Sequence, residues 1–217
     1  MKAEVKTKFL IDYCHQHDWD VQGGKLQSPI DIQTNQTQME STRIGIQLNL
    51  SSTPATFFNN GQNLQLLGSG QACLNHRVFD FVQVHFHADG EHRIDGEHFP
   101  LEGHFLFQAP NGQTGVIGVL YRAGKHNSDF DHVLKQYEEE KGEGSFSVET
   151  LIPENKSYYH YIGSLTTPPL TEGIEWYVLQ TVLEVSSEQI ERFISLHGKN
   201  SRSCQALHDR QVIEFGE

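Results

Sequence analysis

Two histidines separated by one residue, and a third that follows a polar stretch, are the residues of this chain best suited to do chemistry. His85 and His87 lie in the segment QVHFH at 83–87, and His104 ends the segment EGH at 102–104. Side chains of a strand repeat every two residues, so His85 and His87 point to one face. If the second segment pairs with the first as an antiparallel strand, His104 lies across from them. Three imidazoles on one face can hold Zn²⁺ and leave its fourth tetrahedral position open, which is typical of a catalytic zinc site.

The residues beside these histidines bear on whether they bind a metal. A lone His-x-His pair is more often an ordinary surface or core pair than a metal site. A metal-ligating histidine, however, usually donates its other ring N–H to a carboxylate or carbonyl oxygen. Gln83 lies two residues before His85 and Glu102 two before His104, so each shares a face with a candidate ligand. We therefore expect both to orient these imidazoles.

Short strands separated by turn residues are expected to position these side chains. The strand candidates are 43–50, 55–59, 63–67, 78–87, 99–107, 114–121 and 174–185, which are rich in β-branched and aromatic residues. Two segments have helical periodicity instead. In 127–140 the helix is capped by Asn127 or Ser128, and in 186–197 Ser186 and Gln189 form a capping box. The pattern predicts one α+β domain over residues 1–217, mostly β, with a few peripheral helices and a lead-in over 1–20.

Composition narrows the choice of partners and compartment. The 217 residues have a net charge of −12, which argues against nucleic-acid binding, and no apolar run of transmembrane length occurs, so no membrane association is expected. The N-terminus lacks the apolar segment of a signal peptide. Cys14, Cys73 and Cys204 form no C-x-x-C motif, and an odd number argues against a disulfide framework. We expect a cytoplasmic protein, with secretion or a periplasmic location after signal-peptide removal as the alternative.

Further motifs run in order along the chain. They are QSPIDI (27–32), NNG (59–61), QVHFH (83–87), EHxxDG (91–96), ExH (102–104), GSLTTPP (163–169), Trp176 and N-x-R-x-x-Q-x-L-x-x-R (200–210). Together with the histidines, these motifs resemble the α-class carbonic anhydrases over about nine-tenths of the chain. The resemblance implies a large, mainly antiparallel, twisted central sheet with zinc at the base of a conical cleft. It also implies reversible hydration of CO₂ to bicarbonate and a proton, by attack of a zinc-bound hydroxide.

The resemblance assigns roles to individual residues. His85, His87 and His104 match the zinc ligands. Gln83 and Glu102 match partners of His85 and His104, and a backbone carbonyl near Asn200 supports the remaining ligand. Thr166 matches a threonine that accepts a hydrogen bond from the zinc-bound hydroxide and donates its own proton to a carboxylate, which Glu91 matches. A threonine whose proton is committed in this way can only accept, so the hydroxide is oriented toward CO₂.

The same resemblance supplies a substrate pocket and ligands. Leu106, Val116, Leu165 and Trp176 match the apolar CO₂ pocket, although each could equally be plain core, and Thr167 is expected to contact bicarbonate or anionic inhibitors. His92 and Tyr161 match buried hydrogen-bonding positions without a catalytic role. The expected partners are CO₂ and bicarbonate together with anion and sulfonamide-type inhibitors, and the expected assembly is a monomer or a homodimer.

Two departures from the family pattern carry predictions. The position that is commonly a proton-shuttle histidine, just after NNG, is Gln62. Because an amide does not titrate near pH 7, we expect proton release to limit turnover. The disulfide of extracytoplasmic bacterial relatives would involve Val21 or Gln22 and Leu170, and none of these is cysteine.

Two alternatives remain at this point. The same hydroxide could hydrolyse activated esters, or the fold could serve as a non-catalytic binding module. Non-catalytic relatives typically lose one or more of the zinc histidines, whereas this chain keeps all three together with Thr166 and Glu91.

Overall fold

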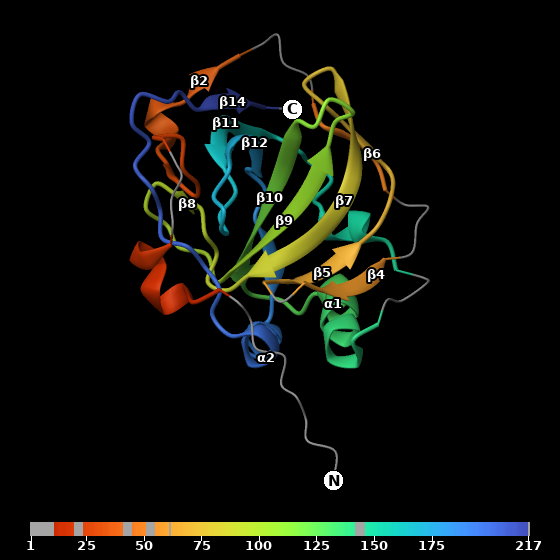
Figure 1. The fold of residues 1–217 in the computed structure, drawn as a ribbon. Coiled ribbons are helices and arrows are strands. Elements are labelled where there is room, and N and C mark those ends of the chain that lie inside the picture. Colours follow the sequence, from red (N-terminus) through yellow and green to blue (C-terminus); the bar gives the residue numbers. More distant parts are fainter. Residues whose placement is uncertain are drawn as a thin grey trace.

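A broad twisted sheet runs through the molecule, with helices packed against one end (Figure 1). The computed structural model describes residues 11–19, 24–40, 45–50, 55–60, 62–141 and 146–216. Of the expected lead-in, residues 1–10 and 20 lie outside the described residues, as do Val21 and Gln22. Within the described part no helix has the length and apolar character to cross a membrane.

The sheet has twelve strands among the described residues and mixes antiparallel and parallel pairs, with antiparallel pairs in the majority. Its strands are β2 (Gln38–Met39), β3 (Gln47–Asn49), β4 (Thr56–Asn59), β5 (Leu64–Leu67), β6 (Gln71–Leu74), β7 (Arg77–His87), β9 (Leu101–Gln108), β10 (Thr114–Ala123), β11 (Tyr158–Ser164), β12 (Glu172–Leu179), β13 (Leu183–Val185) and β14 (Ile213–Phe215). The main path runs β2-β14-β11-β12-β10-β9-β7-β5-β4, with β3, β6 and β13 off it. Strands β1 (Asp31–Ile32) and β8 (Arg93–Ile94) form a small parallel pair.

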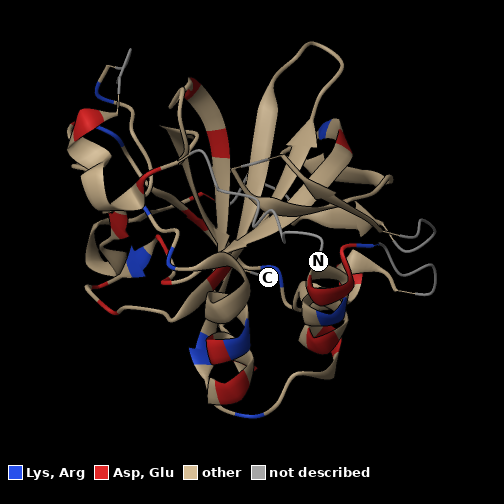
Figure 2. Cartoon of the chain, turned by 60° about the horizontal axis from the view of Figure 1, so that its bottom comes forward, with Lys and Arg blue, Asp and Glu red and all other residues tan. Residues whose placement is uncertain are grey.

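Five helical segments complete the described structure. They are the 3₁₀ turns η1 (Tyr13–Asp18), η2 (Thr34–Gln36) and η3 (Val148–Leu151), and the helices α1 (Ser128–Glu139) and α2 (Ser187–His197). The predicted caps are present: Asn127 Oδ1 accepts from the backbone N–H of Phe130, and Ser186 and Gln189 form a capping box. Both helices carry acidic and basic residues (Figure 2) and bury apolar residues, as amphipathic surface helices do.

The central strands are buried on both faces. On one side Phe86, Phe105 and Tyr121 pack with Phe130 of α1 and Phe193 of α2 in the larger core. The other side holds a smaller core that includes residues of β10, β11 and β12. This arrangement explains why the second half of β7 is almost continuously buried, although apolar residues alternate there with glutamine and histidine.

Several strand predictions were wrong in extent or missing. The expected strand 174–185 is two strands, β12 and β13, interrupted at residues 180–182. Only Gln47–Asn49 of the expected 43–50 is a strand, and residues 43–44 lie outside the described part. Strands β6, β11 and β14 and the two-residue strands were not predicted. β11 was hidden by a glycine and the proline-rich run that follows it, because both are turn signals.

Candidate metal and catalytic site

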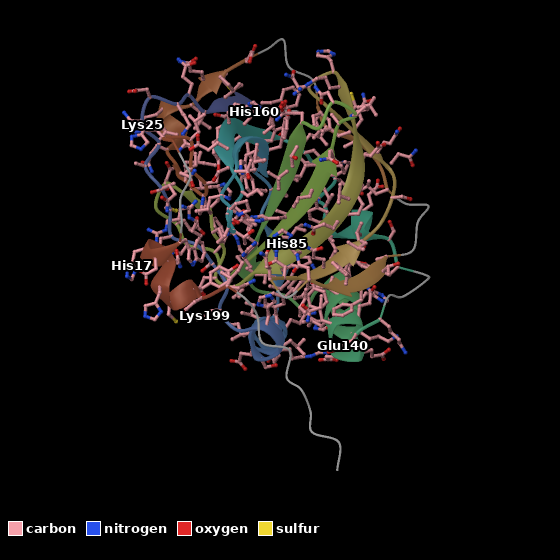
Figure 3. All side chains as sticks on the ribbon, in the orientation of Figure 1. His17, Lys25, His85, Glu140, His160 and Lys199 are labelled. Carbon is pink, nitrogen blue, oxygen red and sulfur yellow. The ribbon has the colours of Figure 1, made fainter. Side chains whose placement is uncertain are left out.

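Strand register brings the three histidines together. His85 of β7 is directly opposite His104 of β9, and His87 lies two residues further along the same face. The ring centroids are 4.9 Å apart for His85 and His87, 5.3 Å for His85 and His104, and 4.5 Å for His87 and His104. One nitrogen from each ring lies within 4.8 Å of the others. Figure 3 places His85 near the middle of the sheet, where β7 and β9 run side by side.

Hydrogen bonds hold each imidazole in one orientation. His85 Nδ1 donates to Gln83 Oε1 at 3.0 Å, and His104 Nε2 donates to Glu102 Oε1 at 2.9 Å. His87 Nδ1 donates to the backbone carbonyl of Asn200 at 2.7 Å. These bonds leave His85 Nε2, His87 Nε2 and His104 Nδ1 as the ring nitrogens available to a metal. His87 Nε2 is buried and has no hydrogen-bond partner within the described structure, as expected for a nitrogen that ligates an ion.

The protonation of the cluster also suits a cation. Burial, reinforced for His85 by the other two rings, lowers the pKa of all three imidazoles, and that of His87 to about 4. They are therefore neutral at pH 7, the form in which histidine ligates a metal. The chemistry of the donor set, three neutral nitrogens with oriented rings, fits Zn²⁺.

A second group of potential ligands, His92, Glu102 and His104, overlaps the first. The atoms that could bind a metal here are already engaged in hydrogen bonds, because His92 Nδ1 and His104 Nε2 both donate to Glu102 Oε1, at 2.7 and 2.9 Å. Tyr161 bonds His92 Nε2 at 2.7 Å and Ser28 Oγ at 2.9 Å. This group is therefore a hydrogen-bonded support for His104, in line with the non-catalytic position expected for His92 and Tyr161.

Glu102 is an ionised, buried carboxylate that accepts hydrogen bonds from the backbone and from the rings beside the site. Its Oε2 accepts from the backbone N–H groups of Glu91 and His92 at 2.7 and 2.8 Å. Burial on its own raises the pKa of Glu102, but the adjacent His92 and His104 outweigh it and hold the pKa well below its usual range. An ionised carboxylate at this position can accept from both rings at once.

Thr166 and Glu91 lie together in the site. Both are buried, and burial raises the pKa of Glu91 to about 7, against the lowering effects of His104 and of the Thr166 side chain. Glu91 Oε1 accepts from the backbone N–H of Arg202 at 2.7 Å, and Oε2 lies 3.9 Å from His104 Nδ1. A cation on the histidines would favour the carboxylate form.

The loop that presents Thr166 is fixed from both ends. Leu165 N donates to Thr171 O at 2.9 Å and Leu170 N to Thr167 O at 3.0 Å. Just before the loop, Ser164 N donates to Ser28 Oγ at 3.0 Å. The QSP and GSLTTPP motifs therefore contact each other and together hold the loop of Thr166 in place.

Register also builds an apolar wall beside the histidines. One row across β7, β9, β10 and β12 consists of Gln83, Leu106, Val116 and Trp176, directly next to the row that contains His85 and His104. A pocket of about 120 Å³ lies over both rows. Its lining includes all five expected substrate-pocket residues, Leu106, Val116, Leu165, Thr167 and Trp176, together with Gln62, Thr166, His85 and His104.

Sequence reasoning missed several contributors. Arg202 reaches Glu91 through its backbone and Ser28 O through its guanidinium at 2.7 Å, across more than a hundred residues of sequence. Asn60 orients the turn that carries Gln62, because its Oδ1 accepts from Gln62 N and Asn63 N, both at 2.8 Å. The NNG and N-x-R motifs are evident in the sequence, but residue spacing alone does not reveal which residues their side chains and backbone contact.

Comparisons with known proteins agree with this geometry. The sequence model of the eukaryotic-type carbonic anhydrase family matches residues 13–215. A carbonic anhydrase of Pectobacterium atrosepticum is 36% identical, over 88% of this chain and 80% of that protein. Another, from Neisseria gonorrhoeae, is also 36% identical, over 88% of this chain and 78% of that protein.

The fold has a solved counterpart. The α-carbonic anhydrase of Thermovibrio ammonificans, in complex with the inhibitor sulfanilamide, superposes with a TM-score of 0.81 at 35% identity, covering 88% of this chain and 87% of that one. Family match, relatives and fold together show that this chain belongs to the α, or eukaryotic-type, carbonic anhydrase family.

Proposed function

We propose that this chain interconverts CO₂ and bicarbonate with a zinc ion held by His85, His87 and His104. The observation that carries the proposal is the convergence of three neutral, buried imidazoles whose other nitrogens are all bonded to oxygen acceptors. Zinc bound by three neutral imidazoles lowers the pKa of a water molecule to about 7 and so supplies a nucleophile at neutral pH.

The residues around the histidines supply orientation and a place for the substrate. A hydrogen bond from the Thr166 hydroxyl to the Glu91 carboxylate would leave the Thr166 oxygen to act only as an acceptor toward the nucleophile. Val116, Leu106 and Trp176 offer an uncharged wall, which suits CO₂ better than bicarbonate. The wall adjoins the histidine row, so a bound CO₂ lies within reach of attack.

Removal of the proton is the step for which the pocket is poorly equipped. Gln62 lies where a titrating side chain would serve, and its amide cannot take up a proton near pH 7. We propose that proton release limits turnover when buffer is scarce.

Inhibitors and location follow as further proposals. The sulfanilamide complex of the Thermovibrio relative supports binding of sulfonamides by this chain. Cys14, Cys73 and Cys204 are all free thiols, which supports a reducing compartment such as the cytoplasm.

The test combines metal analysis with a CO₂ hydration assay on one preparation. We expect one zinc per chain, loss of hydration after chelation, and recovery in proportion to the zinc restored. His87→Ala should fold but neither hold zinc nor hydrate CO₂, whereas the exposed His126→Ala should match the wild type. A folded, zinc-loaded chain without hydration activity would contradict the proposal.

A further inference from the structure

Each CO₂ that becomes bicarbonate releases one proton, which must leave the pocket. Among the described residues that line the pocket, the titratable side chains are His85 and His104, and both are assigned to the metal. The remaining polar side chains are amides and the hydroxyls of Thr166 and Thr167, which do not titrate near neutrality. A proton carrier therefore has to lie just outside the pocket.

A second, larger cavity adjoins the first. It measures about 480 Å³ and is lined by residues of η1 and its caps, among them Asp12, His15 and Trp19, and by Gln62 and Pro168. Gln62 borders both cavities, and Pro168 directly follows Thr167 of the first. The two hollows thus meet at Gln62, and the larger one contains a histidine.

The segment that carries this histidine is tied to the wall of the site. Gln16 Nε2 donates to Ser201 O at 2.9 Å, and Ser203 N donates to Gln16 Oε1 at 2.9 Å. Between these two anchor points lies Arg202, whose backbone holds Glu91. Burial, with a smaller contribution from the charge of Glu91, raises the pKa of Tyr13 in η1.

His15 itself has the form that a proton carrier needs. Its side chain is 61% exposed, so it meets solvent, and its Nδ1 donates to Asp12 Oδ2 at 2.8 Å. This bond leaves Nε2 as the nitrogen that can accept a proton. Asp12 is held in turn, because its Oδ1 accepts from Cys14 N at 2.9 Å.

Among the residues that the structure describes, an acidic side chain and a second histidine also lie near His15. Asp18 lines the same cavity, and the His17 ring is centred 6.1 Å from that of His15. Gln62 and Pro168, which also line this cavity, are uncharged.

We propose that His15 performs the proton transfer that Gln62 cannot, more slowly than a histidine at position 62 would, so that proton release still limits turnover in dilute buffer. The proton released by CO₂ hydration passes through the solvent of the two adjoining cavities to Nε2 of neutral His15, and the imidazolium then gives it to a buffer base. No other bond changes, and His15 returns to its neutral form. This inference rests on the proposed function.

The kinetic test compares two histidines of the same segment. His17 is 76% exposed and does not line the cavity, so His17→Ala is the matched control for His15→Ala. A well-positioned proton-transfer group contributes about a hundredfold or more; because His15 is exposed, we expect His15→Ala to lower turnover about tenfold in dilute buffer. Turnover of His17→Ala should stay at the wild-type level. In concentrated imidazole, His15→Ala should recover, because the buffer carries the proton instead.

A second readout does not depend on activity. In protein loaded with Co²⁺ and observed by NMR, the paramagnetic ion should broaden the ring protons of His15 more than those of His17. Figure 3 shows His17 at the outer edge of the molecule, away from His85. Broadening of His17 equal to or greater than that of His15 would contradict the proposal.

The outcomes separate the two proposals. A wild-type chain that does not hydrate CO₂ even in concentrated imidazole contradicts the proposed function. An active wild type with an equally active His15→Ala variant in dilute buffer contradicts only the role of His15. A deficit of His15→Ala that persists in concentrated imidazole means that the substitution damages the site, and it also overturns the proton-transfer role.

Discussion

At the scale of single residues, Thr166 carries the hydroxyl that we propose orients the nucleophile. It is 4% exposed, lies in the pocket with His85 and His104, and interacts with Glu91. A free hydroxyl could donate as well as accept, whereas one committed to a carboxylate can only accept. The value of Thr166 therefore lies in its pairing with Glu91.

Removing this hydroxyl should cost activity without removing the metal. We expect Thr166→Ala to lower kcat/KM for CO₂ hydration by about a hundredfold, the usual cost of one oriented hydrogen bond in a transition state. Thr166→Ser, which keeps the oxygen, should retain most of the activity. Zinc analysis checks that both variants are loaded. Equal activity of the alanine and serine variants would show that the hydroxyl has no orienting role.

A substitution at Gln62 tests whether proton release limits turnover. Asn60 fixes the turn beneath it, so a histidine at this position would be held at the mouth of the pocket. We expect Gln62→His to raise turnover in dilute buffer and to change it little in concentrated imidazole. Stopped-flow initial rates at both buffer concentrations measure this. A wild-type rate that is already high and independent of buffer would refute a limiting proton release.

At the scale of elements, strand register explains why the ligands and the apolar wall are neighbours. Residues directly opposite in adjacent strands share a face, so one row of the sheet supplies His85 and His104 and the next supplies Leu106, Val116 and Trp176. The sequence predicted the histidine row because its spacing is local. Predicting the apolar wall from residue spacing would also require the parallel pairing of β10 with β12, and spacing does not reveal that pairing.

Gly163 is the point at which β11 turns into the loop of Thr166. The register of β11 against β12 shifts here, and a Cβ at this position would overlap Ser28 Oγ and lie 2.9 Å from Trp176 Cδ1. Gly163→Ala should therefore destabilise the fold by about 2 kcal/mol or more, which urea unfolding can measure. Gly216→Ala, whose added Cβ meets no atom within 4 Å, should leave the unfolding midpoint unchanged. A stable Gly163→Ala protein would mean that the close approach to Ser28 relaxes easily.

Long-range contacts mark the limit of what the sequence could provide. Helices α1 and α2 were predicted to within about a residue because periodicity and caps are local signals. The carbonyl of Asn200 lies 113 residues from His87, and Gln16 lies 185 residues from Ser201. The first was expected only through family resemblance. The second was not expected, because η1 has no periodic pattern.

At the scale of the whole molecule, a charged cluster remote from the histidines links three strands. Glu175 of β12 forms an ion pair with Arg77 of β7, accepts from Tyr177 at 2.9 Å and lies 3.7 Å from His160 of β11. Burial on its own raises the pKa of Glu175, but interactions with His160, Arg77 and Tyr177 prevail and hold the pKa at about 2.

This cluster predicts a specific acid sensitivity. Because the pKa of Glu175 is about 2 in the folded state against 4.5 ordinarily, its contribution to stability is fully present above about pH 4.5 and is lost as the pH falls toward 2. Glu175→Gln should be less stable at pH 7 but should lose less stability across this interval than the wild type. Thermal unfolding between pH 5 and 2.5 measures the slopes. The exposed Glu154→Gln should follow the wild type, and a wild-type slope in Glu175→Gln would refute the assignment.

The measurement that most directly tests the whole account is the exchange of ¹⁸O between labelled CO₂ and water at chemical equilibrium. The exchange reports interconversion of CO₂ and bicarbonate on protein with a known zinc content, without net turnover. We predict that the chain with one bound zinc depletes the label from CO₂ far faster than the uncatalysed reaction, and that His87→Ala does not. Exchange at the uncatalysed rate, with zinc bound and the fold intact, would contradict the assignment of His85, His87 and His104 as a catalytic centre.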